Sequence, residues 1–599
     1  MVFELNYQKN NNEKLFKDLE KFLEIEYSQN YIPIYTRYFQ LNETNYKNIN
    51  LNHSFYLNEI LKDLNETNSY ECSLKNTNDE IVSREVFFKF SPLLDPVKYM
   101  LGKYDITNEN LLQLPDFMNK NSHAKSRDTN NSAYVDGYFT YLTSQLLNHH
   151  GFVNGLDYYG SFLGTKKNFI VNVIDDLEYL SESEFFNNNK EQLFTIDYEE
   201  QSKIFNFDSR NNKKRLFIDD DNNNDTIITL DDIEKLEDIN NLFHTSNETE
   251  INVVGEHDLI YENELIVSKN DTKVSNSTCS SRTSNTDNSD NDNSDNDNSD
   301  NDNSDNDNSD NDNSDNDNDN SHSDNSSEGD SNDEDNSNSD EINSISESDD
   351  VVNAKINKFP VNIICLEKCS STLDDLMVSN ELSTKEWCAI LMQIIMILIT
   401  YQKCFNFTHN DLHTNNIMYI ETEKEFLYYK FNNKYYKVPT YKRIIKIIDF
   451  GRSIYKFKGV SVCSDSFHKK GDAATQYNFE PYMNENKPRL EPNYSFDLCR
   501  LACSIYDFLI TDENVNRTPI TSLINEWCKD DKGRNILYKT NGEERYPDFK
   551  LYKMIVRSVH EHTPQNQLKR ELFSQFLIPK NKLSKVKKII NIDDIPVYI

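Results

Sequence analysis

The residues most able to do chemistry lie in one short stretch and at one position further along the chain. His409, Asp411 and Asn416 fall within eight positions and directly precede a strand-like apolar run, and a second apolar run ends at Asp449. Two short strands that each offer an oxygen donor can hold a divalent cation against phosphate, because magnesium takes few protein ligands and completes its shell with phosphate oxygens. The pattern therefore predicts a metal–phosphate site at Asn416 and Asp449. The alternative is that these side chains only cap turns.

The spacing of these residues resembles the signature of one enzyme superfamily. Residues 409–416 read His-Asn-Asp-Leu-His-Thr-Asn-Asn and resemble the protein-kinase catalytic loop, H-R-D-L-x-x-x-N, while residues 449–451 match D-F-G. The chain thus resembles the eukaryotic-like protein kinase superfamily, and in particular the divergent Ser/Thr kinase-like proteins of giant DNA viruses. The resemblance implies an α+β, bilobal protein-kinase-like fold with a small β-rich N-lobe and a larger helical C-lobe.

The resemblance also implies a role for each matching residue. Asp411 would be the catalytic residue that orients the attacking hydroxyl, and Asn416 and Asp449 would hold magnesium against the phosphates of ATP. Lys89 would take part in catalysis by neutralising phosphate charge, with Asp136 as its acidic partner at the cofactor site. ATP and magnesium are therefore the implied cofactors.

Four further residues complete the implied site. Glu367 and Cys369 fall where a kinase hinge binds adenine through its backbone. His409 would have a structural role in fixing the catalytic loop, and Asp497, in a helix-like run, would brace that loop.

The local pattern gives Lys89 and Asp136 some support of its own. Residues 86–90 read Val-Phe-Phe-Lys-Phe, a strand with a lone lysine between aromatics; the alternative is an edge-strand lysine that points to solvent. Residues 133–150 have helical spacing of apolar side chains, and Asp136 is the one acid among them. No glycine precedes Gly102, so the glycine-rich turn that lets backbone amides approach phosphates is missing.

Two departures from the family pattern bear on function. Asn410 stands where many protein kinases have the Arg that receives an activation-loop phosphate, so that bidentate partner is lost. His413 replaces a common Lys, which also resembles haspin-like and small-molecule kinases. The sequence favours ATP- and Mg-dependent phosphoryl transfer to Ser/Thr hydroxyls of proteins. The alternatives are a pseudokinase scaffold with little turnover and a small-molecule phosphotransferase of the aminoglycoside or choline kinase type.

The formal charge of −38 is concentrated in one segment. Residues 281–350 hold 25 Asp or Glu and one Arg, which leaves a net charge of −14 for the rest of the chain. From Ser289 a Ser-Asp-Asn-Asp-Asn unit repeats with a period of five. Such dense like charge with so little apolar surface does not fold alone. We therefore expect a long disordered acidic insertion, and basic proteins among the protein substrates.

Composition also narrows the partners and the compartment. Lys and Arg are not clustered as a nucleic-acid-binding surface requires, and ten irregularly spaced cysteines indicate reduced thiols. The N-terminus lacks a signal-peptide pattern, and the longest apolar run, 389–400, is too short to cross a bilayer and suits a buried helix. We expect a soluble, intracellular protein with no nucleic-acid or membrane partner, in the host cytoplasm or virion if it is viral.

These features predict the order of the parts. Residues 1–80 have an uncertain fold; 81–175 form the N-lobe, with two strands joined at Thr165–Lys167; 176–355 form the insertion; 356–580 form the hinge and C-lobe; 581–599 form a tail. Ser383 and Glu386 predict a capping box that opens a helix. Residues 421–441 predict a hairpin that extends the strands carrying Asn416 and Asp449, and residues 452–492 predict an irregular activation segment.

Overall fold

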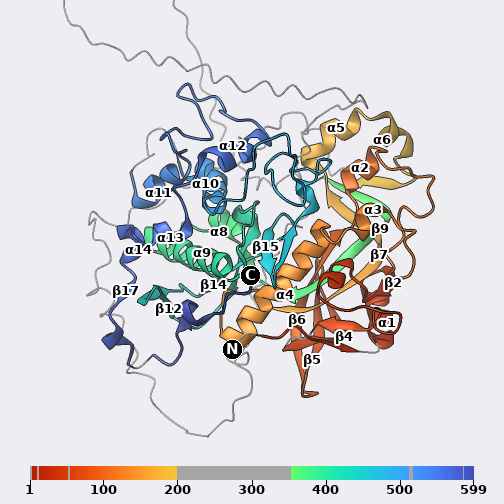
Figure 1. Cartoon of the computed structure of the whole chain (residues 1–599), viewed down its shortest axis with the longest axis horizontal. Coiled ribbons are helices and arrows are strands. Elements are labelled where there is room, and N and C mark those ends of the chain that lie inside the picture. Colours follow the sequence, from red (N-terminus) through yellow and green to blue (C-terminus); the bar gives the residue numbers. More distant parts are fainter. Residues whose placement is uncertain (1–2, 10–11, 52–53, 198–351, 511–516, 585) are drawn as a thin grey trace, which may run out of the picture. The chain divides into compact units, whose positions relative to one another are not determined.

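The structure is a computed structural model that describes residues 3–9, 12–51, 54–197, 352–510, 517–584 and 586–599. The predicted Ser-Asp-Asn repeat at about 281–350, and most of the predicted insertion, lie outside the described residues. The described chain is a mixed α+β protein, with a β-rich N-terminal region and helices in the later part of the chain (Figure 1).

The largest sheet has seven antiparallel strands and contains the predicted Lys89 strand. Its main path runs in the order β2 (Ile25–Gln29), β7 (Tyr158–Asn172), β9 (Asn353–Glu367), β6 (Ile81–Pro92), β5 (Ser69–Asn76) and β4 (Phe55–Glu66), and β8 (Phe194–Asp197) also pairs with β9. Lys89 lies on β6, an interior strand, opposite Ile364 of β9. The N-terminal 80 residues thus contribute three strands to the same sheet.

One expectation about this sheet was wrong, and the segment assigned to the insertion has folded ends. The predicted turn at Thr165–Lys167 does not form, because β7 is one long strand whose pairing with β9 continues through these residues. The segment assigned to the insertion also begins and ends as folded structure, since α5 (Leu177–Ser181), α6 (Glu184–Asn189) and β8 precede residue 198 and β9 starts at Asn353. Neighbouring strands, which single-sequence patterns do not reveal, decide both outcomes.

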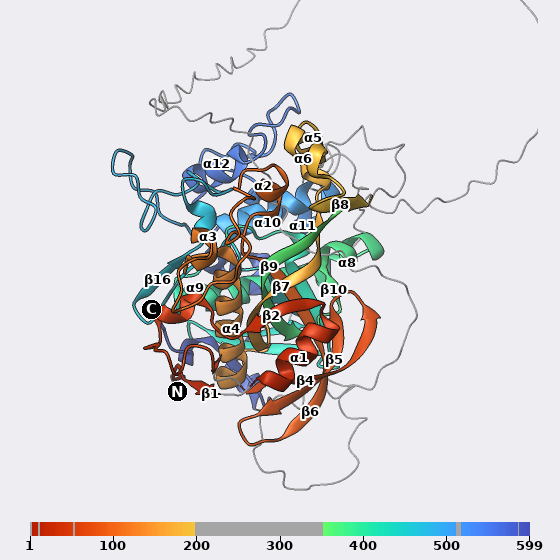
Figure 2. The same ribbon diagram turned by 90° about the vertical axis from the view of Figure 1, so that its right-hand side faces the viewer.

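Helix α4 (Ser132–His150) is central to the packing. Asn131 caps its first turn by accepting a hydrogen bond from the Ala133 amide, and Gly151 ends it with a left-handed φ of 62°. The helix packs against β7 and β9 (Figure 2), and its Phe139 ring stacks on Phe407 at 4.3 Å. It therefore joins the large sheet to the helical part of the chain. On the other side of the sheet region, α1 (Glu13–Phe22) packs against β2 and β4.

The later part of the chain surrounds one long buried helix, α9 (Thr384–Phe405). Ser383 and Glu386 form the predicted capping box at its start. By length and hydropathy α9 could cross a membrane, but 94% of its most apolar window is buried inside the protein. The other helices here are α8 (Leu373–Ser379), α10 (Phe496–Leu509), α11 (Pro519–Trp527), α12 (Lys550–Ser558), α13 (Pro564–Gln567) and α14 (Glu571–Ser574).

Small sheets hold the loops of the predicted site. A three-stranded sheet contains β10 (Ser371–Thr372), β11 (Ile417–Glu421) and β14 (Arg443–Ile447). The predicted hairpin is present as β12 (Phe426–Phe431) and β13 (Lys434–Pro439), and its two turn residues, Asn432 and Asn433, have positive φ. The prediction that it extends β11 and β14 was wrong, because it pairs instead with β17 (Leu577–Ile578) and β18 (Ile590–Asn591).

The described residues also form several shorter helices and strands. They are β1 (Tyr7–Lys9), β3 (Ile49–Leu51), α2 (Pro96–Met100), α3 (Ala124–Arg127), β15 (Ile454–Phe457) and β16 (Val460–Cys463). The β15–β16 hairpin lies in the segment after D-F-G that we expected to be irregular.

A buried ion pair ties β9 to β14. The side chains of Lys446 and Glu367 are 1% and 2% exposed and their charged atoms lie 2.6 Å apart. Lys446 also donates to the Gly155 carbonyl oxygen at 2.7 Å, and Glu367 accepts a hydrogen bond from the Asp157 amide at 2.8 Å. These contacts hold the chain around Gly155, just beyond α4, to both strands.

We expect Lys446→Met to lower the free energy of unfolding by about 3–5 kcal/mol, because it leaves the Glu367 carboxylate buried without a counter-charge. Urea denaturation measures this loss, and Lys539→Met, at an exposed pair, should change stability by less than about 0.5 kcal/mol. Adding Glu367→Gln to Lys446→Met should recover much of the loss, since Gln still accepts the amide hydrogen bond. A double variant as unstable as Lys446→Met would contradict this explanation.

Candidate functional site

One lysine connects three separate elements at the centre of the site. Lys89 on β6 places its Nζ 2.7 Å from Oδ2 of Asp136 on α4 and 2.9 Å from Oδ1 of Asp449, just after β14. The Lys89 side chain is only 16% exposed, so the alternative of a solvent-facing edge lysine does not hold. The structure thus brings together three residues that are 47 and 313 positions apart in the sequence.

The residues after β14 turn sharply so that Asp449 and Phe450 point in different directions. Asp449 adopts a left-handed φ of 62°, a conformation that Asp tolerates better than most residues. The Phe450 ring is buried and meets the Phe139 ring edge-on at 4.8 Å. The Phe450 amide donates to Asp136 Oδ1 at 2.9 Å. Asp136 therefore contacts both Lys89 and the backbone of the D-F-G turn.

The two carboxylates beside Lys89 have shifted pKa values in opposite directions. Burial raises the pKa of Asp136 above its ordinary value, more than the nearby Lys89 ammonium lowers it. Burial also acts to raise the pKa of Asp449, but the charge and hydrogen bond of Lys89 outweigh it and the pKa is lowered. The contact with Lys89 thus favours the charged form of Asp449, which is the form that binds metal.

Asp411 lies in a second polar cluster next to this one. Its Oδ1 accepts a hydrogen bond from the Tyr552 hydroxyl at 2.8 Å, and its Oδ2 lies 3.4 Å from Arg452 Nη1. The same Tyr552 oxygen accepts from Arg500 Nε at 2.9 Å. Burial acts to raise the pKa of Asp411, but Arg452, His413 and Arg500 together lower it well below its usual range. The lowered pKa keeps Asp411 as a carboxylate, which can accept a hydrogen bond from a hydroxyl. Its oxygens contact Tyr552 and Arg452, so the alternative that this side chain only caps a turn does not hold.

Asn416 is oriented by the catalytic-loop stretch itself. Its Nδ2 donates to the Asp411 carbonyl oxygen at 2.9 Å and lies 3.1 Å from His413 Nε2, which leaves its amide oxygen as the acceptor. Its own carbonyl accepts from the Ile448 amide at 3.0 Å, which joins it to the chain just before Asp449. Burial lowers the pKa of His413 to about 4, so its ring is uncharged at neutral pH.

The oxygen atoms of Asp449 and Asn416 are of the type that magnesium prefers as ligands, although the protein supplies few of them. Magnesium prefers hard oxygen ligands and binds through one or two carboxylates together with substrate phosphates, and Asp449 and Asn416 offer a charged carboxylate and an amide oxygen. Within the described ranges, no group of three or more His, Cys, Asp or Glu has the arrangement of a metal site made by protein alone.

Residues 409–416 are held in place by contacts of Asp497 and His409. The Asp497 carboxylate, on α10, accepts from the His409 amide at 3.0 Å and from the Asn410 amide at 2.9 Å. His409 in turn places Nε2 2.9 Å from the Ile448 carbonyl oxygen and accepts at Nδ1 from the Asp411 amide. The loop carrying Asp411 and the strand leading to Asp449 are thereby fastened together.

Of the two predicted hinge residues, Glu367 ends β9 and Cys369 follows two residues later. The Glu367 carboxylate is buried and paired with Lys446, and the Glu367 amide donates to the Asp157 carbonyl oxygen at 3.2 Å. Cys369 is partly buried, and burial raises the pKa of its thiol.

Sequence reasoning missed two asparagines with positive φ at the end of β4 and in the turn that follows it. Asn68 lies in the turn between β4 and β5 and Asn65 lies near the end of β4, and each has a φ of 56°. The Asn68 carbonyl accepts from the Phe88 amide at 2.8 Å, which places this turn beside Lys89. Asparagine is the residue after glycine that most readily adopts positive φ. Two closely spaced Asn residues between strand-like runs were the available signal.

Comparison with known proteins gives a limited kinase relationship. No protein-family model matches the chain. It is 30% identical over 115 residues to Probable kinase 098L of Invertebrate iridescent virus 3, which covers 19% of this chain and 22% of that protein. The match spans less than a quarter of the relative's length, and it indicates a kinase-like relationship without showing the substrate or the cofactors.

We expect Asp497→Ala to lower the free energy of unfolding by at least about 2 kcal/mol, because two buried amides lose their acceptor. Asp593 offers a matched control, since it accepts from the amides of Asn432 and Asn433 at an exposed turn. Water can replace that carboxylate, so Asp593→Ala should cost less. Equal losses for the two variants in urea denaturation would show that burial of the Asp497 bonds is not what matters.

Proposed function

We propose that the protein is a kinase that uses ATP and magnesium to phosphorylate Ser/Thr hydroxyls of protein substrates, within a bilobal protein-kinase-like fold. The observation that carries the proposal is the position of the Lys89 ammonium between Asp136 and Asp449. A cation held in this way lies beside a carboxylate that can bind metal. The partial match to a probable viral kinase supports the same class of reaction.

The chain's own residues would divide the work of phosphoryl transfer, which depends mainly on positioning and charge neutralisation. Lys89 would bind phosphate oxygens, and Asp136 would keep its ammonium in place. Asp449 and Asn416 would hold the magnesium, which when bound neutralises phosphate charge. Asp411 would accept a hydrogen bond from the acceptor hydroxyl and orient it for in-line attack.

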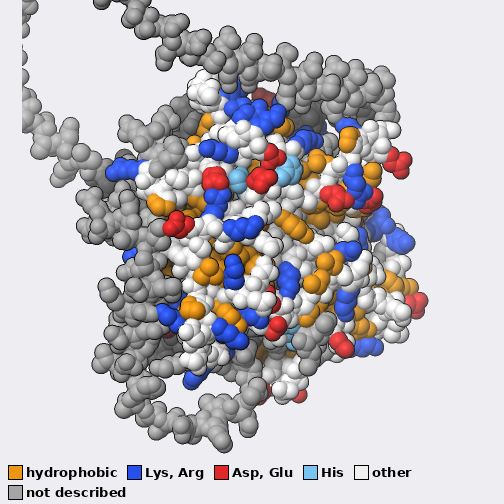
Figure 3. All heavy atoms as spheres, turned by 60° about the vertical axis from the view of Figure 1, so that its left-hand side comes forward, with side chains coloured by type: hydrophobic (Ala, Val, Ile, Leu, Met, Phe, Trp, Pro, Cys, Tyr) orange, Lys and Arg blue, Asp and Glu red, His pale blue; other side chains and the backbone are white. Residues whose placement is uncertain are grey.

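The acceptor and the compartment rest on sequence features. The D-F-G match and the Asp497 brace favour a protein acceptor over a small molecule, and the acidic repeat favours basic proteins. On the face shown in Figure 3, Lys and Arg side chains lie among acidic and apolar ones. We propose that nucleic acid is not a partner, because the sequence does not cluster Lys and Arg as such a surface requires. We place the protein inside the cell, in the host cytoplasm or virion if it is viral, with no membrane partner.

A second candidate function is a kinase-like binding protein with little turnover. The observation that favours it is the occupation of the Asp411 carboxylate by Arg452 and Tyr552. If these contacts persisted with substrate present, Asp411 could not reach an acceptor hydroxyl. A small-molecule phosphotransferase has no comparable support from the contacts.

Binding and transfer can be separated by one pair of variants. Mg-ATP at about 100 times its Kd should stabilise the native protein by about 2.7 kcal/mol, seen as a rise in Tm. Asp411→Asn should keep this rise but lose at least about 100-fold in transfer of labelled phosphate to protein substrates, since it removes the oriented carboxylate. Asp79→Asn, at an exposed ion pair, should change neither.

The contrary results are distinct. Transfer by Asp411→Asn at the wild-type rate would remove Asp411 from its proposed role. ATP binding with no transfer by the wild-type protein would favour the binding protein. Chelation of magnesium with EDTA should abolish both the Tm shift and the transfer, and ATP binding that survives EDTA unchanged would contradict the metal assignment.

A further inference from the structure

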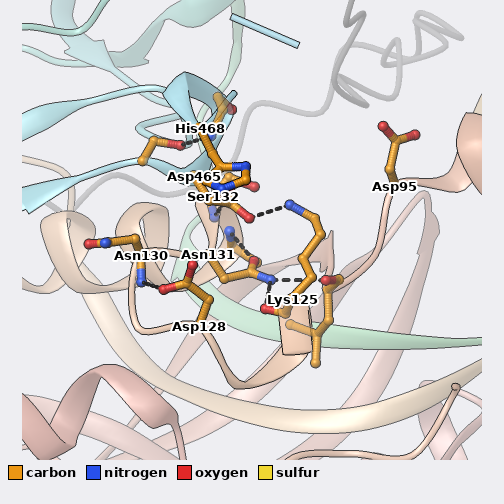
Figure 4. A network of polar contacts seen from close by, with 12 residues as sticks. Asp95, Lys125, Asp128, Asn130, Asn131, Ser132, Asp465 and His468 are labelled. Atoms are coloured by element: carbon orange, nitrogen blue, oxygen red, sulfur yellow. Dashed lines mark hydrogen bonds and ion pairs between the residues drawn. The ribbon is translucent and has the colours of Figure 1, made fainter. Parts of the chain in front are cut away.

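A carboxylate outside the Lys89 cluster joins the segment after D-F-G to the start of α4. Asp465 lies two residues after the end of β16, and its side chain is 8% exposed. Oδ2 pairs with Lys125 Nζ, and Oδ1 accepts from the Ser132 amide at 2.9 Å (Figure 4). The Asp465 amide also donates to the Asn130 carbonyl oxygen at 2.8 Å. Both the side chain and the main chain of Asp465 therefore contact the beginning of α4.

The first turn of α4 is built so that Asp465 supplies one of its acceptors. The Asn131 side chain satisfies the Ala133 amide and donates to the carbonyl oxygens of Leu93 and Lys125, each at 2.9 Å. These bonds tie the helix start to the end of β6. The Ser132 amide is left to Asp465, and a negative charge is favourable at a helix N-terminus.

The position of this turn determines where Asp136 lies. Asp136 is four residues after Ser132, so it lies about one turn further along the same face of α4. Its Oδ2 reaches Lys89 at 2.7 Å and its Oδ1 accepts from the Phe450 amide. A shift of the helix start would therefore move the residue that holds Lys89.

The other contacts between residues 452–492 and residues 409–416 are also made by unmodified side chains. Asn410 donates from Nδ2 to the Arg452 carbonyl oxygen at 2.9 Å and accepts at Oδ1 from the Tyr477 hydroxyl at 2.6 Å. Arg452 pairs with Asp472 as well as with Asp411. No phosphate is required for any of these contacts.

We propose that Asp465 is a positioning residue that holds α4 so that Asp136 keeps Lys89 in the site, and that the segment from residue 452 to 492 is set in its working arrangement without phosphorylation. The inference deepens the proposed kinase function and rests on it. Asp465 supplies a negative charge to Lys125 and to the start of α4, and Asn410 makes a neutral contact to the same segment.

The positions of the Ser and Thr residues in the segment are consistent with an arrangement that needs no phosphate. Ser453, Ser464 and Ser466 are buried, and the exposed Ser and Thr residues between 452 and 492 are Ser461 and Thr475. These two contact the rest of the protein through their carbonyl oxygens, which accept from Arg37 and Arg557. Their hydroxyls can therefore be removed without disturbing the segment.

The test compares Asp465→Ala and Asp465→Asn in the full chain with a matched control. Asp465→Ala should lower kcat/KM for ATP at least about tenfold, since a misplacement of about 1 Å can cost on the order of a hundredfold. It should also speed hydrogen exchange at the amides of residues 132–136. Asp465→Asn keeps an acceptor for the Ser132 amide and should recover part of both effects. Glu480→Gln, an exposed carboxylate of the same segment paired with Arg489, should change neither.

The second arm asks whether modification is needed. Ser461→Ala/Thr475→Ala, and wild-type protein treated with a protein phosphatase and confirmed unmodified by mass spectrometry, should keep wild-type kcat. Loss of activity in either would overturn the phosphorylation-independent part of the proposal. Unchanged kcat/KM and unchanged exchange in Asp465→Ala would overturn the positioning role.

The two proposals can fail separately. If wild-type protein binds Mg-ATP but transfers no phosphate, the proposed function fails, while the exchange rates and the ATP-induced Tm shift of Asp465→Ala still decide the positioning role. If wild-type protein transfers phosphate and Asp465→Ala does so equally well with the same KM for ATP, only the positioning role fails.

Discussion

A single ammonium group between two buried carboxylates sets the geometry of the candidate site. Lys89, Asp136 and Asp449 come from a strand, a helix and a loop, and none could be left alone in the interior without a large cost in free energy, because an unpaired buried charge is strongly destabilising. The need to pair these charges therefore fixes the large sheet, α4 and the end of β14 relative to one another.

Apolar packing supports the same arrangement from the other side. Phe139 of α4 contacts Phe450, Phe407 and Tyr401, so the helix that carries Asp136 shares its buried face with the D-F-G turn and with α9. The aromatic contacts make the helix position depend on the core, while the polar contacts orient individual groups. Movement of α4 would disturb both kinds of contact, and the positioning role that we propose for Asp465 at the helix start rests on this dependence.

Local patterns in the sequence anticipated much of this structure. The helix around Asp136, the capping box at Ser383 and the hairpin turn at Asn432 are each encoded by neighbours in the chain. The predicted Lys89–Asp136 pair is present in the structure. These features depend on residues close in sequence, or on a resemblance that matches them one by one.

What could not be predicted depends on pairing between distant residues. Nothing in the stretch around Lys166 shows that β9 lies alongside it and keeps it extended. Tyr552 and Asp465 are likewise ordinary residues in sequence, and only the fold places them beside Asp411 and α4. The positive φ values of Asn65 and Asn68 could not be predicted either, because they depend on how β4 and β5 pair.

The pairing of β8 with β9 has a consequence for how the chain tolerates its large central segment. Asp197 and Asn353 are direct partners across the two strands, so the intervening residues leave and re-enter the sheet at adjacent points. The entropy of closing such a loop grows only slowly with its length. The strand pair closes the enclosed segment at one place in the sheet. On this argument a change in the length of that segment, including the gain or loss of whole Ser-Asp-Asn-Asp-Asn units, should alter neither the register of the sheet nor the place of Lys89.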